Sequence, residues 1–201
     1  MKLTIIGASG HGRVAADIAR LKGYDEIVFL DDDPEKASCG PYAVVGGTDR
    51  AAEGDVFVAI GSPQVRRRLS RGKRPVTLVH PAAVVAEDAV IGEGTVIMAG
   101  AVVNPGAVVG RGCIINTCAS VDHDCRLGDY VHVAVGAHLC GTVEVGDDTW
   151  IGAGSVVSNN LRVCGECMVG AGAVVVRDID IPGTYFGVPA RLRRSKKDAD
   201  R

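Results

Sequence analysis

The most regular feature of the chain is an aliphatic residue at every sixth position between residues 79 and 175. Seventeen successive positions keep this register, and the residues two places before them are mostly small. Apolar residues recur about every 3.6 positions in an amphipathic helix and every second position in a half-buried strand, so neither element explains the pattern. A strict six-residue repeat is typical of a parallel β-helix. The aliphatic positions are Val79, Val85, Ile91, Ile97, Val103, Val109, Ile115, Val121, Leu127, Val133, Leu139, Val145, Ile151, Val157, Val163, Val169 and Val175.

This repeat resembles that of the hexapeptide-repeat acyltransferases, and it covers nearly half of the chain. The resemblance implies that three short strands form one triangular coil of eighteen residues and that the coils wind left-handed. Periodicity alone does not show this hand, because crossovers between parallel strands are usually right-handed. Residues 79–175 then form roughly five coils, separated by about 4.8 Å as neighbouring strands are. We expect a left-handed parallel β-helix of hexapeptide repeats.

The N-terminal residues have a different pattern, that of a small Rossmann-like βαβ unit in an α/β domain. Strands are predicted at 3–6, 27–30 and 56–60, with an amphipathic helix after the first and a short helix at about 64–69. Strands that alternate with helices favour a parallel sheet. We therefore expect a ligand-binding βαβ domain at 1–77, the β-helix domain at 78–182 and a C-terminal tail at 183–201.

Composition and charge narrow the function classes. The chain has 201 residues with 27 glycines and only 4 % aromatics, as expected for a narrow prism filled by aliphatic and small side chains. Its formal net charge of −2 lacks the basic excess typical of nucleic-acid binding. No apolar run approaches the 18 or more residues of a membrane span, and the N-terminus has no signal-peptide pattern. We expect a cytoplasmic protein with neither a nucleic-acid nor a membrane partner.

The seven cysteines are odd in number and accompany no export pattern, so they do not indicate a disulfide framework. Cys113, Cys125 and Cys167 occupy the slot where other repeats carry small residues, and we expect them to be buried. Cys164 and Cys167 have the spacing of a metal or redox motif, but no second pair completes a site. We therefore expect no metal.

A glycine-rich turn at 7–12 lies between the first strand and the first helix, where backbone N–H groups and the helix dipole favour a phosphate. Its spacing differs from the dinucleotide fingerprint, so NAD is not indicated. Three aspartates at 31–33 end the second strand, where an acid commonly meets a ribose hydroxyl. A tight turn and a capped loop are the plain alternatives. Together the two features favour a nucleotide-linked sugar.

The coil length of eighteen residues places the histidines relative to one another. His123 and Gly141 are eighteen apart and are expected to stack on neighbouring coils, whereas His123 and His132 are nine apart and lie on different sides. Together with His138 they spread over different faces, which disfavours a zinc site of the γ-class carbonic anhydrase type. Two flanking aspartates strengthen the proton affinity of His123, as a general base requires, although an exposed inert corner is the alternative.

Motifs along almost the whole chain resemble the bacterial sugar acyltransferases. The similarity is to the UDP-4-amino-sugar N-acetyltransferases of the bacillosamine pathway and, more loosely, to the sialic acid O-acetyltransferases. It implies acetyl-CoA as co-substrate and a homotrimer with the active site between subunits. The motifs are Gly7-Ala-Ser-Gly-His-Gly12, Phe29-Leu-Asp-Asp32, Ala59-Ile-Gly61, Asn116-Thr117, His123-Asp124, His132 and Gly187-Val-Pro-Ala190.

The same resemblance implies a role for each matching residue. His123 is the general base and Asp124 the carboxylate that raises its basicity, where the bacillosamine enzyme has Glu. Together with Gly141, whose N–H steadies the oxyanion, they form the catalytic set. The nucleotide-sugar positions are Ser9, Gly10, His11, Asp31, Asp32 and Gly61, with Asn116 as a further substrate contact. The acetyl-CoA positions are His132, Gly141, Ala153 and Ala171.

The expected activity is direct acetyl transfer from acetyl-CoA to the 4-amino group of a nucleotide-linked 4-amino-4,6-dideoxysugar. Cys118 is the one rival nucleophile, and the register places no base beside it. Two alternatives stay open, a sugar O-acetyltransferase of the sialic acid type and a non-catalytic β-helix scaffold. The basic residues of the tail have two interpretations, contact with the 3′-phosphate of coenzyme A or exposure to solvent. They are Arg191, Arg193, Arg194, Lys196 and Lys197.

Overall fold

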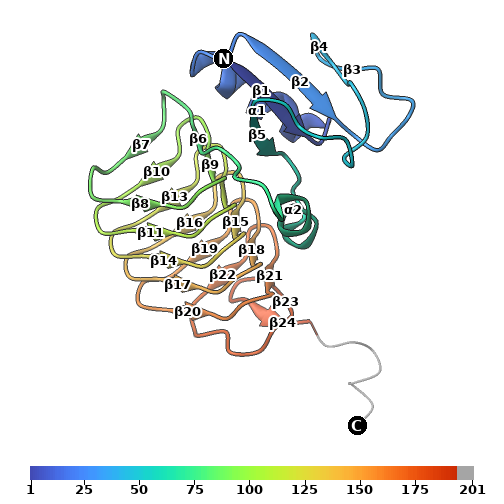
Figure 1. Ribbon diagram of the computed structural model, residues 1–201. Coiled ribbons are helices and arrows are strands. Elements are labelled where there is room, and N and C mark those ends of the chain that lie inside the picture. The colour runs from blue at the N-terminus through green and yellow to red at the C-terminus, as the bar shows by residue number, and fades with distance from the viewer. Residues whose placement is uncertain (194–201) are drawn as a thin grey trace, which may run out of the picture.

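The computed structural model describes residues 1–193 and shows a left-handed β-helix joined to a small α/β unit (Figure 1). Both parts of this fold were predicted from the sequence and are confirmed. The β-helix has three faces, named here by the number of strands in each sheet, and strands β6 to β22 are parallel and two residues long. The six-stranded face holds β7 (Val84–Val85), β10 (Val102–Val103), β13 (Ser120–Val121), β16 (His138–Leu139), β19 (Val156–Val157) and β22 (Val174–Val175). The five-stranded face holds β8 (Val90–Ile91), β11 (Val108–Val109), β14 (Arg126–Leu127), β17 (Glu144–Val145) and β20 (Arg162–Val163). The eight-stranded face holds β6 (Leu78–Val79), β9 (Val96–Ile97), β12 (Ile114–Ile115), β15 (His132–Val133), β18 (Trp150–Ile151), β21 (Met168–Val169), β23 (Thr184–Phe186) and β24 (Arg191–Leu192).

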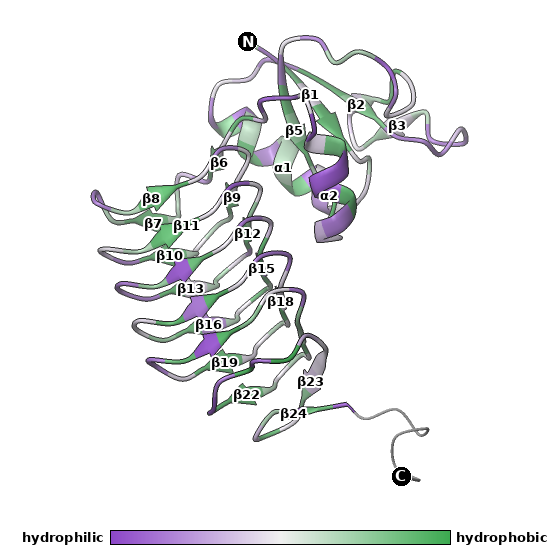
Figure 2. Cartoon of the chain, turned by 60° about the horizontal axis from the view of Figure 1, so that its bottom comes forward, coloured by the Kyte–Doolittle hydropathy of each residue, from purple (hydrophilic) through white to green (hydrophobic). Residues whose placement is uncertain are grey.

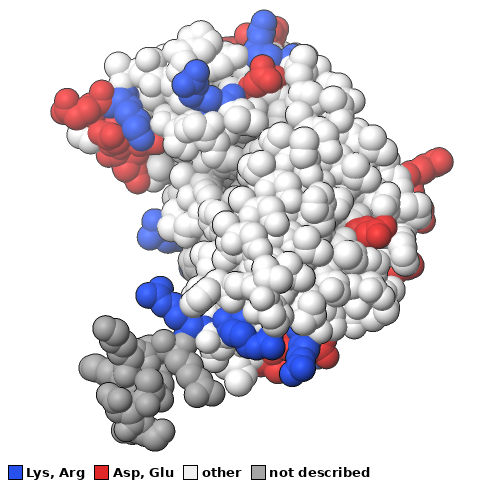
Figure 3. Space-filling model, turned by 180° about the vertical axis from the view of Figure 1, so that it is seen from behind, with Lys and Arg blue, Asp and Glu red and all other residues white. Residues whose placement is uncertain are grey.

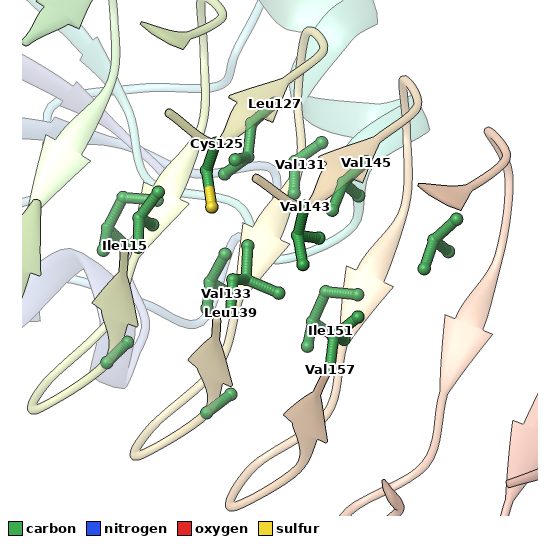
Figure 4. Packing of buried hydrophobic residues seen from close by; sticks show 14 of the residues in the cluster. Ile115, Cys125, Leu127, Val131, Val133, Leu139, Val143, Val145, Ile151 and Val157 are labelled. Atoms are coloured by element: carbon green, nitrogen blue, oxygen red, sulfur yellow. The ribbon is translucent and has the colours of Figure 1, made fainter. Parts of the chain in front are cut away.

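The aliphatic positions of the repeat fill the interior of the prism. In one coil Val133, Leu139 and Val145 come from the three faces and point to the same core, as Figure 4 shows. Paired strands are eighteen residues apart, so like side chains stack on like from coil to coil. The small positions are buried too, including Cys113 and Cys125, which confirms that these cysteines act as small core residues. A core of this width leaves little room for aromatic rings.

The N-terminal unit is a three-stranded parallel sheet in the order β2-β1-β5 with two helices. Its elements are β1 (Lys2–Ile6), α1 (Gly10–Leu21), β2 (Glu26–Leu30), β3 (Ser38–Cys39), β4 (Tyr42–Ala43), β5 (Asp55–Val58) and α2 (Pro63–Ser70). The predicted strands and helices are present within a few residues of their expected bounds. The hairpin β3–β4 was not predicted, because its strands have only two residues each and carry no apolar periodicity.

The N-terminal unit packs against the outer side of the eight-stranded face. Leu78, Val96 and Ile114 occupy outward positions that would ordinarily meet solvent, yet they are buried in one cluster with Ala15 and Ile18 of α1. Helix α2, which is coloured largely as hydrophilic in Figure 2, lies beside the same junction. The two units therefore share a hydrophobic core, which fixes the N-terminal unit on the β-helix.

The part of the predicted tail that the structure describes carries two further strands. β23 pairs in parallel with β21, and β24 returns antiparallel to β23 at the end of the eight-stranded face. Arg191 and Arg193 lie on this extension and are exposed, whereas Arg194, Lys196 and Lys197 fall outside the described residues. Within residues 1–193, no helix is long and apolar enough to cross a bilayer.

Candidate active site

His123 lies in the turn that joins the six-stranded face to the five-stranded face, and this edge is called the His123 corner. Its Nδ1 is 2.9 Å from Oδ2 of Asp124, and both side chains are more than half exposed. Asp124 has φ of +58°, a left-handed conformation that aspartate tolerates better than most residues. The hydrogen bond to Asp124 raises the pKa of His123 above its usual value near 6.5, and the charges of Asp122 and Asp124 act in the same direction. Nε2 is thereby left as the nitrogen available to take a proton.

Gly141 lies directly under the His123 ring on the next coil. A Cβ at this position would overlap with Nε2 and would lie 2.6 Å from Cε1, so the imidazole can occupy its place only over a glycine. Within the described residues the N–H of Gly141 donates no hydrogen bond, although the N–H groups on either side, of Cys140 and Thr142, both do. The corner thus places a basic nitrogen beside an unused backbone N–H. An oxyanion site requires such a donor.

A second polar cluster lies where the N-terminal unit meets the eight-stranded face. The Nδ2 of Asn116 donates to Nε2 of His132 at 3.1 Å, while Oδ1 of Asn116 accepts from the N–H of Thr117 at 2.8 Å. The His132 ring packs on Trp150 with centroids 4.1 Å apart, and Gly61 lies against the same indole. Asn116 therefore has a fixed amide orientation and one N–H left for a ligand.

Two histidines in this junction are neutral at physiological pH. Burial, together with the charge of Arg66, lowers the pKa of His132 to about 3 and that of His11 to about 4. Within the described residues, His132 Nδ1 and His11 Nε2 are buried without a hydrogen-bond partner. The His132 ring is buried between Trp150 and Asn116. The contact between His132 and acetyl-CoA that the resemblance implies therefore stays a prediction.

The glycine-rich turn connects β1 to the start of α1. Ser9 is the N-cap residue without a side-chain capping bond, and Gly10 is the first helical residue. Gly12 has no space for a side chain, because a Cβ there would overlap with the carbonyl of Gly7. The turn is therefore built for close packing and leaves N–H groups at the helix N-terminus for an anion.

The predicted ribose carboxylates are engaged within the fold. Asp31 accepts from the N–H groups of Ala8 at 2.7 Å and Asp33 at 3.1 Å, and it pairs with Lys36. Asp32 accepts from the N–H of Thr48 at 2.7 Å and from its hydroxyl at 3.0 Å. Both residues hold the loops around the glycine-rich turn, and a direct ribose contact stays a prediction.

Ala153 and Ala171 stack on neighbouring coils at the edge between the eight-stranded and six-stranded faces. Gly172 donates to the carbonyl of Ala153 at 2.8 Å, and both alanines are exposed. The outward positions of the adjacent six-stranded face carry no charged residue. Viewed from behind, the molecule likewise has a broad area over the coils without Lys, Arg, Asp or Glu (Figure 3). A ligand or a second chain can therefore lie on this side without desolvating ionised groups.

The predicted site residues do not all meet within one chain. His11, Gly61, Asn116 and His132 meet at the junction, whereas the His123 corner lies along a different edge of the prism. Sequence reasoning missed Arg66, whose buried guanidinium faces the junction. Nothing distinguishes it in the sequence from the adjacent arginines Arg67 and Arg68, so no sequence signal could have found it.

Comparison with known proteins identifies the family. Residues 2–72 match the PglD N-terminal domain, and residues 88–123 match the bacterial transferase hexapeptide (six repeats). The acetyltransferase domain of PglB from Neisseria gonorrhoeae is 41 % identical, with a TM-score of 0.92 over 96 % of this chain and 99 % of that one. The chain belongs to the bacterial hexapeptide-repeat sugar N-acetyltransferases. This membership confirms the family resemblance inferred from the sequence motifs.

Two members of this family have been solved with ligands. The PglB domain in complex with acetyl coenzyme A is 41 % identical, with a TM-score of 0.91, and covers 96 % of this chain and 98 % of its own. PerB from Caulobacter crescentus in complex with CoA and GDP-perosamine is 35 % identical, with a TM-score of 0.90 over 96 % of this chain and 98 % of that one. In residues 1–193 no three His, Cys, Asp or Glu side chains are grouped as a metal site.

The contact between Asp124 and His123 predicts a measurable pH dependence. A general base acts in its neutral form, so activity falls as the pH drops through its pKa. Since Asp124 raises that pKa, the acid limb of kcat/KM is expected above the usual histidine value, and Asp124→Asn is expected to shift it to lower pH. Asp122→Asn is the comparison variant. The charge of Asp122 also raises the pKa of His123, but Asp122 accepts from the His123 backbone N–H rather than from the ring, so a smaller shift in the same direction is expected. A larger shift in the Asp122 variant would contradict this assignment.

Proposed function

We propose that this protein transfers acetyl from acetyl-CoA to the 4-amino group of a nucleotide-linked 4-amino-4,6-dideoxysugar. The observation that carries the proposal is the His123 corner, where an imidazole tied to Asp124 stands over the unused N–H of Gly141. A base beside an oxyanion donor is the arrangement that attack of an amine on a thioester requires. The relatives described above bind acetyl-CoA, or CoA and GDP-perosamine, which supports the same pair of substrates here.

In the proposed reaction His123 Nε2 takes a proton from the sugar amine as the nitrogen attacks the thioester carbonyl. The C–N bond forms, the carbonyl oxygen becomes an oxyanion, and the N–H of Gly141 donates to it. Collapse of this intermediate breaks the C–S bond, and the imidazolium returns its proton to the leaving thiolate. Neither an acyl-enzyme nor a metal takes part, and Cys118 has no role.

The substrate side of the proposal uses the junction. The N-terminus of α1 would hold a phosphate at Ser9 and Gly10, and the free N–H of Asn116 would meet a polar atom of the sugar. His11 also lies at the junction and would contact the sugar in its neutral form. Its Nε2, which has no hydrogen-bond partner among the described residues, can accept or donate a hydrogen bond without introducing a charge. Coenzyme A would run along Ala153 and Ala171, where small side chains leave a shallow exposed edge.

We further propose a homotrimer in which neighbouring prisms complete the site. Within one chain the His123 corner and the junction lie on different edges, so His123 of one chain would serve the sugar held at the junction of the next. The six-stranded face, whose strands carry no charged residue at their outward positions, provides a surface for this side-by-side packing. Sedimentation that returned a fully active monomer would overturn the shared site.

The cytoplasmic location expected from the sequence also stays a prediction.

A substrate panel tests the activity. The protein would be incubated with acetyl-CoA and a UDP-linked 4-amino-4,6-dideoxysugar, GDP-perosamine or sialic acid, and free thiol would be measured. Thiol release is expected only with the nucleotide-linked amino sugars, with mass spectrometry showing an N-acetyl product. Release with sialic acid alone would replace the proposal by O-acetylation, and no release with any acceptor would favour a scaffold.

A further inference from the structure

The thiols of Cys164 and Cys167 lie together in the turn between β20 and β21, where the five-stranded face passes into the eight-stranded face. Their Sγ atoms are 3.4 Å apart, and among residues 1–193 no other two thiols are hydrogen-bonded to each other. We propose that this pair is a thiol–disulfide exchange site, which low-molecular-weight disulfides convert into a disulfide between the two residues. The proposal goes beyond acetyl transfer and does not depend on it.

The fold holds both cysteines on one buried hydroxyl. Thr149, fully buried on the preceding coil, donates from Oγ1 to the carbonyl of Cys164 at 3.1 Å and accepts from the N–H of Cys167 at 3.3 Å. The N–H of Cys164 also donates to Ile179, and the carbonyl of Cys167 accepts from Trp150, both at 2.8 Å. Since a disulfide has an S–S length of about 2.05 Å, the contact needs only a small further approach of the two sulfur atoms. Side-chain rotation can supply this approach while the backbone stays in place.

The two thiols differ in their access to solvent. Cys164 is partly exposed, whereas Cys167 is 3 % exposed and its burial raises the pKa of its thiol. The thiolate is the attacking species in exchange, and it must reach its partner from solvent. Cys164 is therefore the thiol that meets an incoming disulfide, and Cys167 is the thiol that resolves the product. Both lie off the six-stranded face that the proposed trimer would cover.

The exchange has two steps when oxidised glutathione is the incoming disulfide. The Cys164 thiolate attacks one glutathione sulfur, which forms a mixed disulfide and releases the other glutathione as a thiolate. Cys167 then attacks the Cys164 sulfur, the intrachain S–S bond forms, and the second glutathione leaves. The protons of the two protein thiols end on the two glutathione thiolates. The pair is oxidised by two electrons, and the glutathione disulfide is reduced by the same two.

A metal is the other common use of two close thiols. Structural zinc takes four protein ligands, and in the part of the chain that the structure describes no third His, Cys, Asp or Glu joins this pair in a group that could hold a metal. A disulfide needs no further ligand. Disulfides in proteins of reducing compartments are usually transient and redox-sensing, which suits a pair that stands reduced and in contact.

Trypsin releases the site as a single peptide. Cleavage after Arg162 and Arg177 gives residues 163–177, which contain Cys164 and Cys167 and no other cysteine. The reduced full chain would be equilibrated with oxidised and reduced glutathione, its remaining thiols alkylated, and the peptide weighed by mass spectrometry. Loss of two hydrogen atoms without alkylation is expected, and dithiothreitol should reverse it. In urea-unfolded protein, closure is expected to need about tenfold more oxidised glutathione at the same reduced glutathione, because the fold no longer holds the thiols in contact.

Cys140 is the internal control, because it is partly exposed like Cys164 but its tryptic peptide, 127–162, contains no second cysteine. Cys140→Ser is expected to leave closure of the 163–177 peptide unchanged. Cys167→Ser removes the resolving thiol and is expected to leave glutathione attached to Cys164. Cys164→Ser, at a partly exposed position, is expected to block oxidation of this peptide, because the remaining thiol is buried.

Three results would overturn the exchange site. The first is a 163–177 peptide that stays reduced in the folded protein while Cys140 takes up glutathione. The second is closure at the same oxidised glutathione concentration in folded and unfolded chains, since the fold would then contribute nothing. The third is a stable glutathione adduct on Cys164 of the wild type, since Cys167 would then not resolve it. None of these results bears on acetyl transfer, which the substrate panel tests separately.

Discussion

Replacement of His123 by alanine is expected to lower kcat for acetyl transfer by two to four orders of magnitude, the usual contribution of a positioned general base. The variant loses the nitrogen that takes the proton from the amine and keeps the Gly141 N–H. Its fold should be unaffected, because the side chain is 59 % exposed and fills no part of the core. Steady-state kinetics with acetyl-CoA and the accepted amino sugar would measure the loss, with circular dichroism as the check on folding.

His138→Ala is the matched control for this experiment. His138 is also exposed, on the outward side of β16, and its Nδ1 is 2.8 Å from the hydroxyl of Ser120 rather than from a carboxylate. On the neighbouring strand His138 pairs with Val156, so the residue beneath the His138 ring is a valine and not a glycine with a free N–H. Its removal is expected to change kcat by less than about threefold, a minor effect beside the loss of a general base. Equal rates in the His123 and His138 variants would remove His123 from the mechanism.

The periodic part of the molecule could be predicted in detail because each coil repeats one local rule. An aliphatic residue every six positions determines which side chains are buried, and stacking at eighteen residues places Gly141 beneath His123. The same coil length of eighteen residues places His132, which is nine residues from His123, on a different side of the prism. Such predictions succeed because neighbours along the prism axis have a constant separation in sequence.

The junction could not be predicted, because its contacts follow no constant separation. Arg66 lies 46 residues from Gly112 and 64 from Tyr130, and no periodicity relates them. The outward Leu78, Val96 and Ile114 give a weak hint, since three successive apolar residues on an outer face indicate that something covers them. The sequence does not show that α1 is the covering element. The β3–β4 hairpin was missed for a related reason, because its two-residue strands are too short to have a pattern.

The second large effect is expected at Arg66, which joins the two units through hydrogen bonds rather than through an ion pair. Its guanidinium is buried and donates to the carbonyls of Gly112 and Tyr130 in the β-helix, at 2.6 and 2.7 Å. It also donates to Ile60 at 2.7 Å and Gly61 at 2.9 Å in the N-terminal unit. Burial lowers its pKa to about 10, so the group remains charged at neutral pH.

Arg66→Ala leaves these buried carbonyls without a donor and is expected to lower the free energy of unfolding by about 3 kcal/mol or more. Arg66→Lys keeps a charge, but a single ammonium cannot donate to four carbonyls at once. Its free energy of unfolding should therefore lie between those of wild type and Arg66→Ala. Arg68→Ala, an exposed neighbour on α2, should stay within about 0.5 kcal/mol of wild type. Urea unfolding followed by Trp150 fluorescence measures this at the junction itself, since the chain has a single tryptophan.

The same variants separate a structural role of Arg66 from an effect on the substrate site. Because the guanidinium holds the Gly61 carbonyl and Gly61 packs on Trp150 beside His132, its loss is expected to raise KM for the nucleotide sugar more than KM for acetyl-CoA. The His123 corner is built from the β-helix alone and should keep its chemistry, so kcat at saturating sugar should fall less than kcat/KM. If Arg66→Ala unfolded at the same urea concentration as Arg68→Ala, the carbonyls would have another donor and the junction would not depend on this arginine.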